Sequence, residues 1–198
     1  MTTPAIIETH PLVEEILDGH RDRARGDAAG YAGYRGHVYR VLNFARALTP
    51  DGDDRDDKLA VAAAFHDLEA FGGLDYLGPS IQAQDAWLGR TGRQGWSSEL
   101  AVVIAEHHRP TPYRGAQARL AEAFRKADLV DVSQGLIRSG IPRDYVRAVR
   151  RAFDVGSFFT RVVPTAILRN LRAHPLDPLP HMRARRGLGL AGHAGADR

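Results

Sequence analysis

The chain has 198 residues, of which 43% are hydrophobic and 26% are charged, and its net charge is +3. This size and composition fit one globular domain with its own core, and no stretch is long and apolar enough for a membrane-spanning helix. The absence of cysteine excludes disulfides, thiolate nucleophiles and cysteine-based zinc sites, so any metal must be held by imidazole nitrogen and carboxylate oxygen.

The spacing of apolar residues predicts helices along the whole chain and gives little sign of strands. Segments rich in proline, glycine and aspartate separate the expected helices, for example residues 49–57 and 72–80. Pro164 is expected to kink the last helix. The sequence therefore predicts an all-α fold, a compact single-domain bundle of about eight helices. These are expected at residues 11–25, 28–48, 58–71, 80–89, 97–108, 116–136, 142–154 and 157–173.

The domain is expected to cover residues 1–182, and residues 183–198 are expected to form a flexible basic tail rich in glycine, alanine and arginine. A basic tail can contact nucleic acid, but a solvated terminus is the simpler interpretation. The N-terminus lacks the pattern of a secretory signal. We therefore expect a cytoplasmic protein with a small-molecule substrate and with neither a membrane nor a nucleic acid as partner, and the oligomeric state stays open.

Two histidines and two aspartates fall on the inward faces of successive helices. His66 and Asp67 end an alanine-rich helix, where a buried charge is costly unless it is paired or bound to a metal. His37 shares a helical face with apolar residues, and so does Asp128. Each residue alone could be a hydrogen-bonded core histidine or a carboxylate paired with arginine. The four together favour a metal site built from nitrogen and oxygen ligands.

The order His37, His66-Asp67 and Asp128 resembles the HD-domain superfamily of metal-dependent phosphohydrolases. The resemblance is carried by the segments GHVYRVLNFA, AAAFHDLEAF and EAFRKADLVDVS and covers about residues 30–135. It implies an HD-domain-like all-α fold and a divalent metal ion at these four positions. It also implies hydrolysis of a phosphate ester or anhydride of a small metabolite or nucleotide. The metal would be Fe, Mn, Co, Mg or Zn, with one or two ions per chain.

The adjacent residues His107 and His108 precede a proline-broken loop. Some HD-domain subfamilies carry extra histidines before the last aspartate and bind two metals, but those histidines are usually well separated. One of this pair could serve as a ligand or in catalysis. Alternatively, both could only provide positive charge at a helix C-terminus.

Further candidates surround these positions. Glu69 lies three residues after His66, on nearly the same helical face, and could orient or deprotonate a metal-bound water, although it could equally be a solvated residue near a helix end. Asp131 could hydrogen-bond to a metal ligand and orient it. The substrate-binding candidates are Arg109, Arg125 and Asp75, with Tyr76 at the rim of the site.

The resulting hypothesis is a metal-dependent hydrolase in which a bound cation activates water. In it, Glu69, His107 or His108 assists proton transfer, and Arg109 or Arg125 neutralises phosphate. Two alternatives stay open. One is an HD-type diiron oxygenase or hydratase acting on a non-nucleotide small molecule, and the other is a regulatory binding module that retains the metal.

Overall fold

The computed structural model describes residues 3–24, 26–72, 75–156 and 158–162, together with Pro164, Leu168 and Arg172. The described residues form helices and turns without a strand, which confirms the predicted all-α fold. Three short 3-10 turns, η1 (Arg21–Ala24), η2 (Leu68–Phe71) and η3 (Gln94–Trp96), and one π-helical turn, η4 (Phe158–Val162), connect or follow the α-helices. The α-helices are α1 (Pro11–Gly19), α2 (Ala28–Leu48), α3 (Arg55–Phe65), α4 (Leu77–Arg90), α5 (Ser97–Glu106), α6 (Ala118–Val132) and α7 (Arg143–Ala152).

Most predicted helices differ from the observed ones only near their ends, but the third is shifted. It was expected over 58–71, whereas α3 begins at Arg55 inside the predicted loop and ends at Phe65. The first predicted helix is likewise divided into α1 and η1. Of the predicted helix 157–173, residues 158–162 form η4. The expected tail, the predicted kink in that helix and the end of the predicted domain lie outside the described residues.

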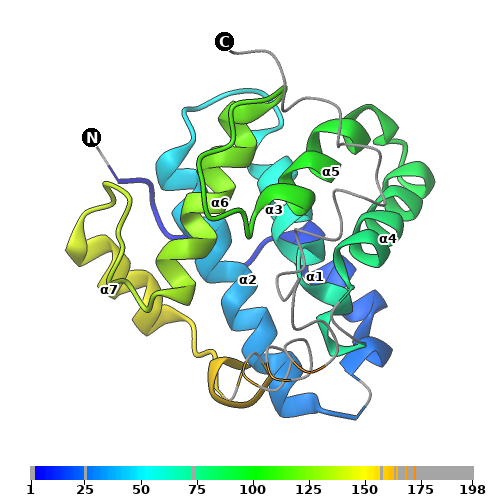
Figure 1. Ribbon diagram of the computed structural model, residues 1–198, viewed down its shortest axis with the longest axis horizontal. Helices are drawn as coiled ribbons and strands as arrows, with labels where there is room; N and C mark the ends of the chain where they lie inside the picture. The colour runs from blue at the N-terminus through cyan, green and yellow to red at the C-terminus, as the bar shows by residue number, and fades with distance from the viewer. Residues whose placement is uncertain are drawn as a thin grey trace.

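Helix α2 is the centre of the bundle. It packs against α3 and α6, and α6 also packs against α5, so these four helices surround a common interior (Figure 1). Along α2 the side chains from His37 to Ala45 are all buried, which fits a helix covered on several sides. No helix in the described part of the chain has the length and apolar character to cross a membrane.

Two glycines of α2 allow the chain after α7 to lie directly on the helix. A Cβ added to Gly36 would stand 1.9 Å from the carbonyl oxygen of Asp154, and one added to Gly33 would stand 2.3 Å from that of Val155. Real Cβ atoms do not approach backbone so closely, so this segment packs here only because both side chains are absent. The contact places Phe158 of η4 in the core.

We expect Gly36→Ala to lower the free energy of unfolding by about 1–3 kcal/mol, because overpacking outweighs the gain of about 1 kcal/mol in helix propensity. Gly78→Ala is the matched control. Gly78 is also in a helix, but nothing lies within 4 Å of the position of its Cβ. Urea unfolding of both variants tests the prediction, and equal stabilities would show that the contact with Asp154 is not tight.

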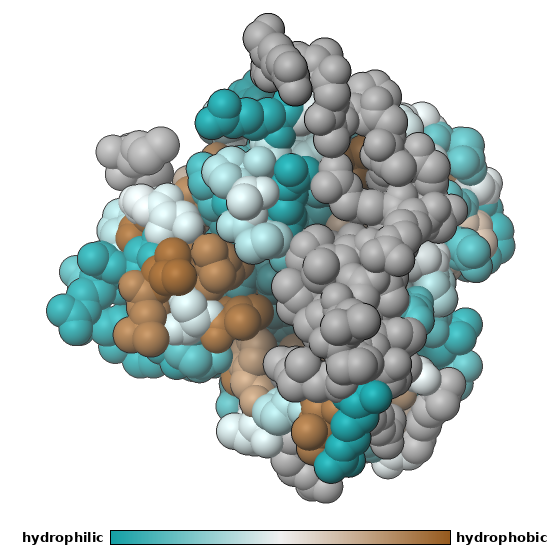
Figure 2. Space-filling model, viewed as in Figure 1, coloured by the Kyte–Doolittle hydropathy of each residue, from teal (hydrophilic) through white to brown (hydrophobic). Residues whose placement is uncertain are grey.

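A group of apolar side chains is exposed where α6 ends and the chain turns toward α7. Val132, Leu136 and Ile137 are 44%, 88% and 49% exposed. Figure 2 shows an apolar patch over this part of the molecule, at the left of the view. These side chains are thus excluded from the core formed by α2, α3, α5 and α6.

Candidate metal centre

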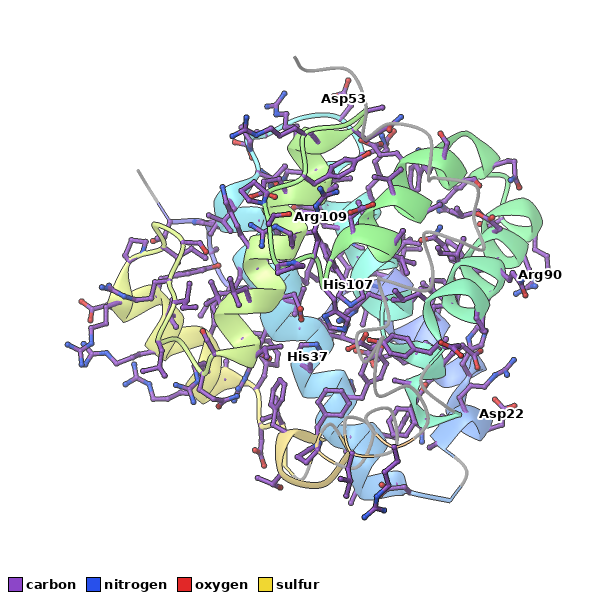
Figure 3. All side chains as sticks on the ribbon, in the orientation of Figure 1. Asp22, His37, Asp53, Arg90, His107 and Arg109 are labelled. Carbon is purple, nitrogen blue, oxygen red and sulfur yellow. The ribbon has the colours of Figure 1, made fainter. Side chains whose placement is uncertain are left out.

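Six titratable side chains meet between α2, α3, α5 and α6. They are His37 of α2, His66 and Asp67 directly after α3, His107 and His108 directly after α5, and Asp128 of α6. Figure 3 shows His37 and His107 in the middle of the bundle, on different elements. Of the six, only His108 has a side chain with substantial exposure, at 28%. The six side chains form three overlapping groups whose ligand atoms lie within metal-binding distance of one another: His37, His66 and Asp128; His66, Asp67 and His107; and His107, His108 and Asp128.

His66 ends α3 and is fixed by it. Its Nδ1 donates a hydrogen bond to the carbonyl oxygen of Ala63, 2.7 Å away, one of the carbonyls that a helix end leaves without a partner. A carbonyl can only accept, so the proton is on Nδ1 and the unprotonated Nε2 is the atom that points toward the other ligands.

His107 ends α5 in the same way. Its Nδ1 donates to the carbonyl oxygen of Ile104 at 2.7 Å, and its Nε2 lies 3.2 Å from Oδ1 of Asp67. Each of the two helices is therefore followed directly by a histidine. The Nδ1 of that histidine is held by its own helix, and its Nε2 points into the centre. This is the arrangement in which metal-binding imidazoles are usually held.

His37 is oriented by a carboxylate instead of a carbonyl. Its Nδ1 donates to Oδ2 of Asp131 at 2.7 Å, and its Nε2 lies 3.0 Å from Nε2 of His66. The Nε2 of His37 is also 3.5 Å from Oδ1 of Asp128 and 3.9 Å from Oδ2 of Asp67. The Nε2 atoms of His37 and His66 thus meet beside Asp128, and those of His66 and His107 both lie near Asp67.

These spacings fit a bound cation. Two nitrogens, each about 2.1 Å from one ion and at right angles to each other, are about 3.0 Å apart, the separation found between His37 and His66. In addition, Oδ1 of Asp128 is buried without any hydrogen-bond partner. A buried carboxylate oxygen without a partner costs free energy, and a cation at this position would remove that cost.

The two carboxylates also reach the second pair of histidines. Oδ1 of Asp67 lies 3.2 Å from Nε2 of His107, and Oδ2 of Asp128 lies 3.5 Å from Nδ1 of His108. On its other side, the Nε2 of His108 is hydrogen-bonded to the hydroxyl of Tyr76. Each carboxylate therefore has one oxygen toward His37 and the other toward the 107–108 pair.

The electrostatics of the centre keep the two aspartates charged. Burial raises the pKa of Asp67, but His66, His107 and His108 outweigh it and hold that pKa well below its usual value. Burial lowers the pKa of His66 to about 4, and the neighbouring His37 contributes to this. His66 is therefore neutral at physiological pH, the form in which imidazole binds metals.

Aromatic rings cover the centre. Phe158 of η4 stacks on His37 with ring centroids 5.2 Å apart, and Phe159 meets the same ring edge-on at 5.3 Å. Phe124 of α6 packs edge-on against His66. The rings exclude water from the imidazoles, which strengthens electrostatic interactions there.

Four predicted site residues are not part of this cluster. Glu69 pairs with Arg23 of η1, 3.3 Å from its Nη1, because α3 ends before Glu69 and the expected helical register is lost. Arg109 pairs with Glu106, and Arg125 donates two hydrogen bonds to Glu122. Asp75 is exposed in the segment that leads to α4.

The pair of Arg125 and Glu122 predicts a pH dependence of stability. Hydrogen bonds from Arg125 lower the pKa of Glu122 to about 2, so its contribution is complete above the unfolded value of 4.5 and is lost as the pH falls toward 2. We expect Glu122→Gln to reduce the free energy of unfolding by about 1–3 kcal/mol above pH 5.5 and by progressively less below pH 4.5. Chemical denaturation at several pH values measures the difference, and a difference independent of pH would contradict it.

One residue of the site that the sequence did not indicate is Arg40. Its guanidinium is 5% exposed and lies 3.3 Å from Oδ1 of Asp131, behind His37. In the sequence, only its position three residues after His37 could have indicated that Arg40 belongs to the site. Tyr76, expected at the rim, is buried and contacts His108.

Comparison of the chain with models of protein families, with curated proteins and with solved structures finds no match. The geometry of the buried His and Asp groups, together with the HD-domain resemblance of the sequence, is therefore the basis for assigning a function.

Proposed function

We propose that the protein is a metal-dependent hydrolase of HD-domain type that acts on a phosphate ester or anhydride of a small molecule. The observation that carries the proposal is the meeting of the Nε2 atoms of His37 and His66, each on a ring whose Nδ1 is anchored, beside the partnerless Oδ1 of Asp128. His37, His66, Asp67 and Asp128 would hold a divalent ion. Such an ion would lower the pKa of water and polarise a phosphoryl oxygen.

Metal binding, substrate approach and proton transfer can each be assigned to residues of the cluster. His37 and His66 have their Nδ1 atoms occupied and can offer only Nε2. His108 is the partly exposed member of the cluster, so we place the approach of the substrate on its side. Its ring, between the hydroxyl of Tyr76 and the carboxylate of Asp128, is suited to carry a proton between the centre and solvent.

A second candidate is a two-metal oxygenase or hydratase acting on a non-nucleotide small molecule. It is favoured by the second ligand group, in which His107 and His108 face the outer oxygens of Asp67 and Asp128. The ion pairs of Arg109 and Arg125 also favour it. These two arginines were expected to bind a substrate phosphate, and each is instead paired with a glutamate.

Elemental analysis of the purified protein, combined with a screen of phosphorylated metabolites, separates these functions. Metal-dependent release of phosphate that disappears in His66→Ala supports the hydrolase. Two irons per chain with consumption of oxygen support the second candidate. A bound metal without turnover of any substrate supports a regulatory module and overturns both enzymatic proposals.

A further inference from the structure

Asp131 lies three residues after Asp128 on α6 and is completely buried. Its two oxygens have different partners. Oδ2 accepts from Nδ1 of His37 at 2.7 Å, and Oδ1 lies 3.3 Å from Nη1 of Arg40. A buried carboxylate is stable only when its charge is compensated, and here the compensation comes from Arg40 and from the ring that Asp131 orients.

Arg40 is itself fixed by the end of another helix. Its Nε and Nη2 donate to the carbonyl oxygen of Phe153 at 2.9 and 2.7 Å, and Nη2 also donates to that of Arg150 at 3.1 Å. These are carbonyls at the C-terminal end of α7, which a helix leaves unpaired. The guanidinium therefore connects the end of α7 to Asp131, and Asp131 connects it to His37.

We propose that Arg40 and Asp131 are positioning residues for the metal centre. Asp131 keeps the proton of His37 on Nδ1 and the Nε2 directed toward His66, and Arg40 prevents Asp131 from turning away. The C-terminal end of α7 sets the position of Arg40. The proposal rests on the proposed function, because it assumes that His37 is a metal ligand.

The test uses Asp131→Asn and Arg40→Gln, with Arg40→Lys as the conservative variant. Titration with Co²⁺, followed by its visible absorption, measures affinity and ligand geometry without any substrate. We expect Asp131→Asn to weaken Co²⁺ binding by about 10–100-fold and to alter the spectrum, as is typical when a supporting carboxylate is removed. Arg40→Gln should weaken binding in the same direction, and Arg40→Lys should restore part of the affinity.

Asp56→Asn is the matched control. Asp56 also pairs with arginines, since its Oδ1 lies 3.0 Å from Nε of Arg46 and 2.7 Å from Nε of Arg55. It is at the start of α3, away from the six clustered side chains. This variant loses ion pairs of the same kind, so it should keep the wild-type Co²⁺ affinity and spectrum.

A second readout does not depend on the metal. Nitrogen-15 shifts of the His37 ring in the metal-free protein at alkaline pH report which nitrogen carries the proton. We expect the Nδ1–H form in the wild type and a mixture of forms in Asp131→Asn. Wild-type Co²⁺ affinity and an unchanged His37 tautomer in a folded Asp131→Asn variant would overturn the positioning proposal alone. A wild-type protein that binds no Co²⁺ would instead overturn the proposed function, and the positioning of His37 toward a metal would fall with it.

Discussion

Asp67→Ala is expected to bind no metal and to lose hydrolytic activity by more than about 100-fold. This factor is the upper end of what loss of a supporting residue costs, and the loss of a ligand should exceed it. Asp67 is the residue with the most contacts in the centre, since its oxygens lie within 3.9 Å of His37, His66, His107 and His108. Removing it takes a ligand from both groups of histidines at once.

Metal content by elemental analysis and phosphate release, both measured beside the wild type and Asp56→Asn, test this expectation. Circular dichroism shows whether the variant is folded. An Asp67→Ala protein that keeps its metal and its turnover would show that the reaction takes place elsewhere.

Chelation of the metal is expected to lower the melting temperature by about 8–16 °C relative to protein in excess metal. A ligand that binds only the folded chain stabilises it by about 4 kcal/mol at a thousand times its dissociation constant. Each kcal/mol corresponds to about 2–4 °C in a protein of this size. The ligands come from α2, from α6 and from the residues that directly follow α3, so the unfolded chain cannot assemble the same site.

Differential scanning calorimetry with EDTA and with increasing Mn²⁺, Co²⁺ or Zn²⁺ measures the shift and identifies the ion that stabilises most. Asp67→Ala should show no shift with any of them. If the wild type melted at the same temperature with chelator and with metal, the cluster would be a proton-linked core network and not a metal site.

The fold and the cluster could be predicted because both depend on helical periodicity. His37 and Asp128 each share a face with apolar residues, so the side that packs inward was readable from the chain. The structure places His37, His66, Asp67 and Asp128 close together, and it brings the two catalytic candidates His107 and His108 to the same cluster. The adjacency of the last two departs from the separated histidines of the two-metal pattern, and for this reason only one of them was expected to act as a ligand. Both reach the centre because α5 has already ended at Glu106.

The predicted residues that lie outside the cluster do so because a helix ends early or because of local pairing. The expected role of Glu69 assumed that the helix of His66 continued, and it ends at Phe65. Arg109 and Arg125 each lie three residues after a glutamate, and this spacing was sufficient for a local ion pair. Arg40 could not be assigned, because its partners in α6 and after α7 are 91 and 113 residues away.

The histidines that directly follow α3 and α5 make the lengths of these helices part of the candidate metal centre. One inserted or deleted residue within α3 would turn the ring of His66 by about 100° and move it 1.5 Å along the axis, away from the other ligands. After such a change, the apolar side chains of α3 could still pack in the core, but His66 would no longer point toward His37 and Asp128. Insertions during divergence of this protein should therefore accumulate in the connections before Arg55 and after Glu69, while the interval from the start of α3 to Asp67 keeps a constant length.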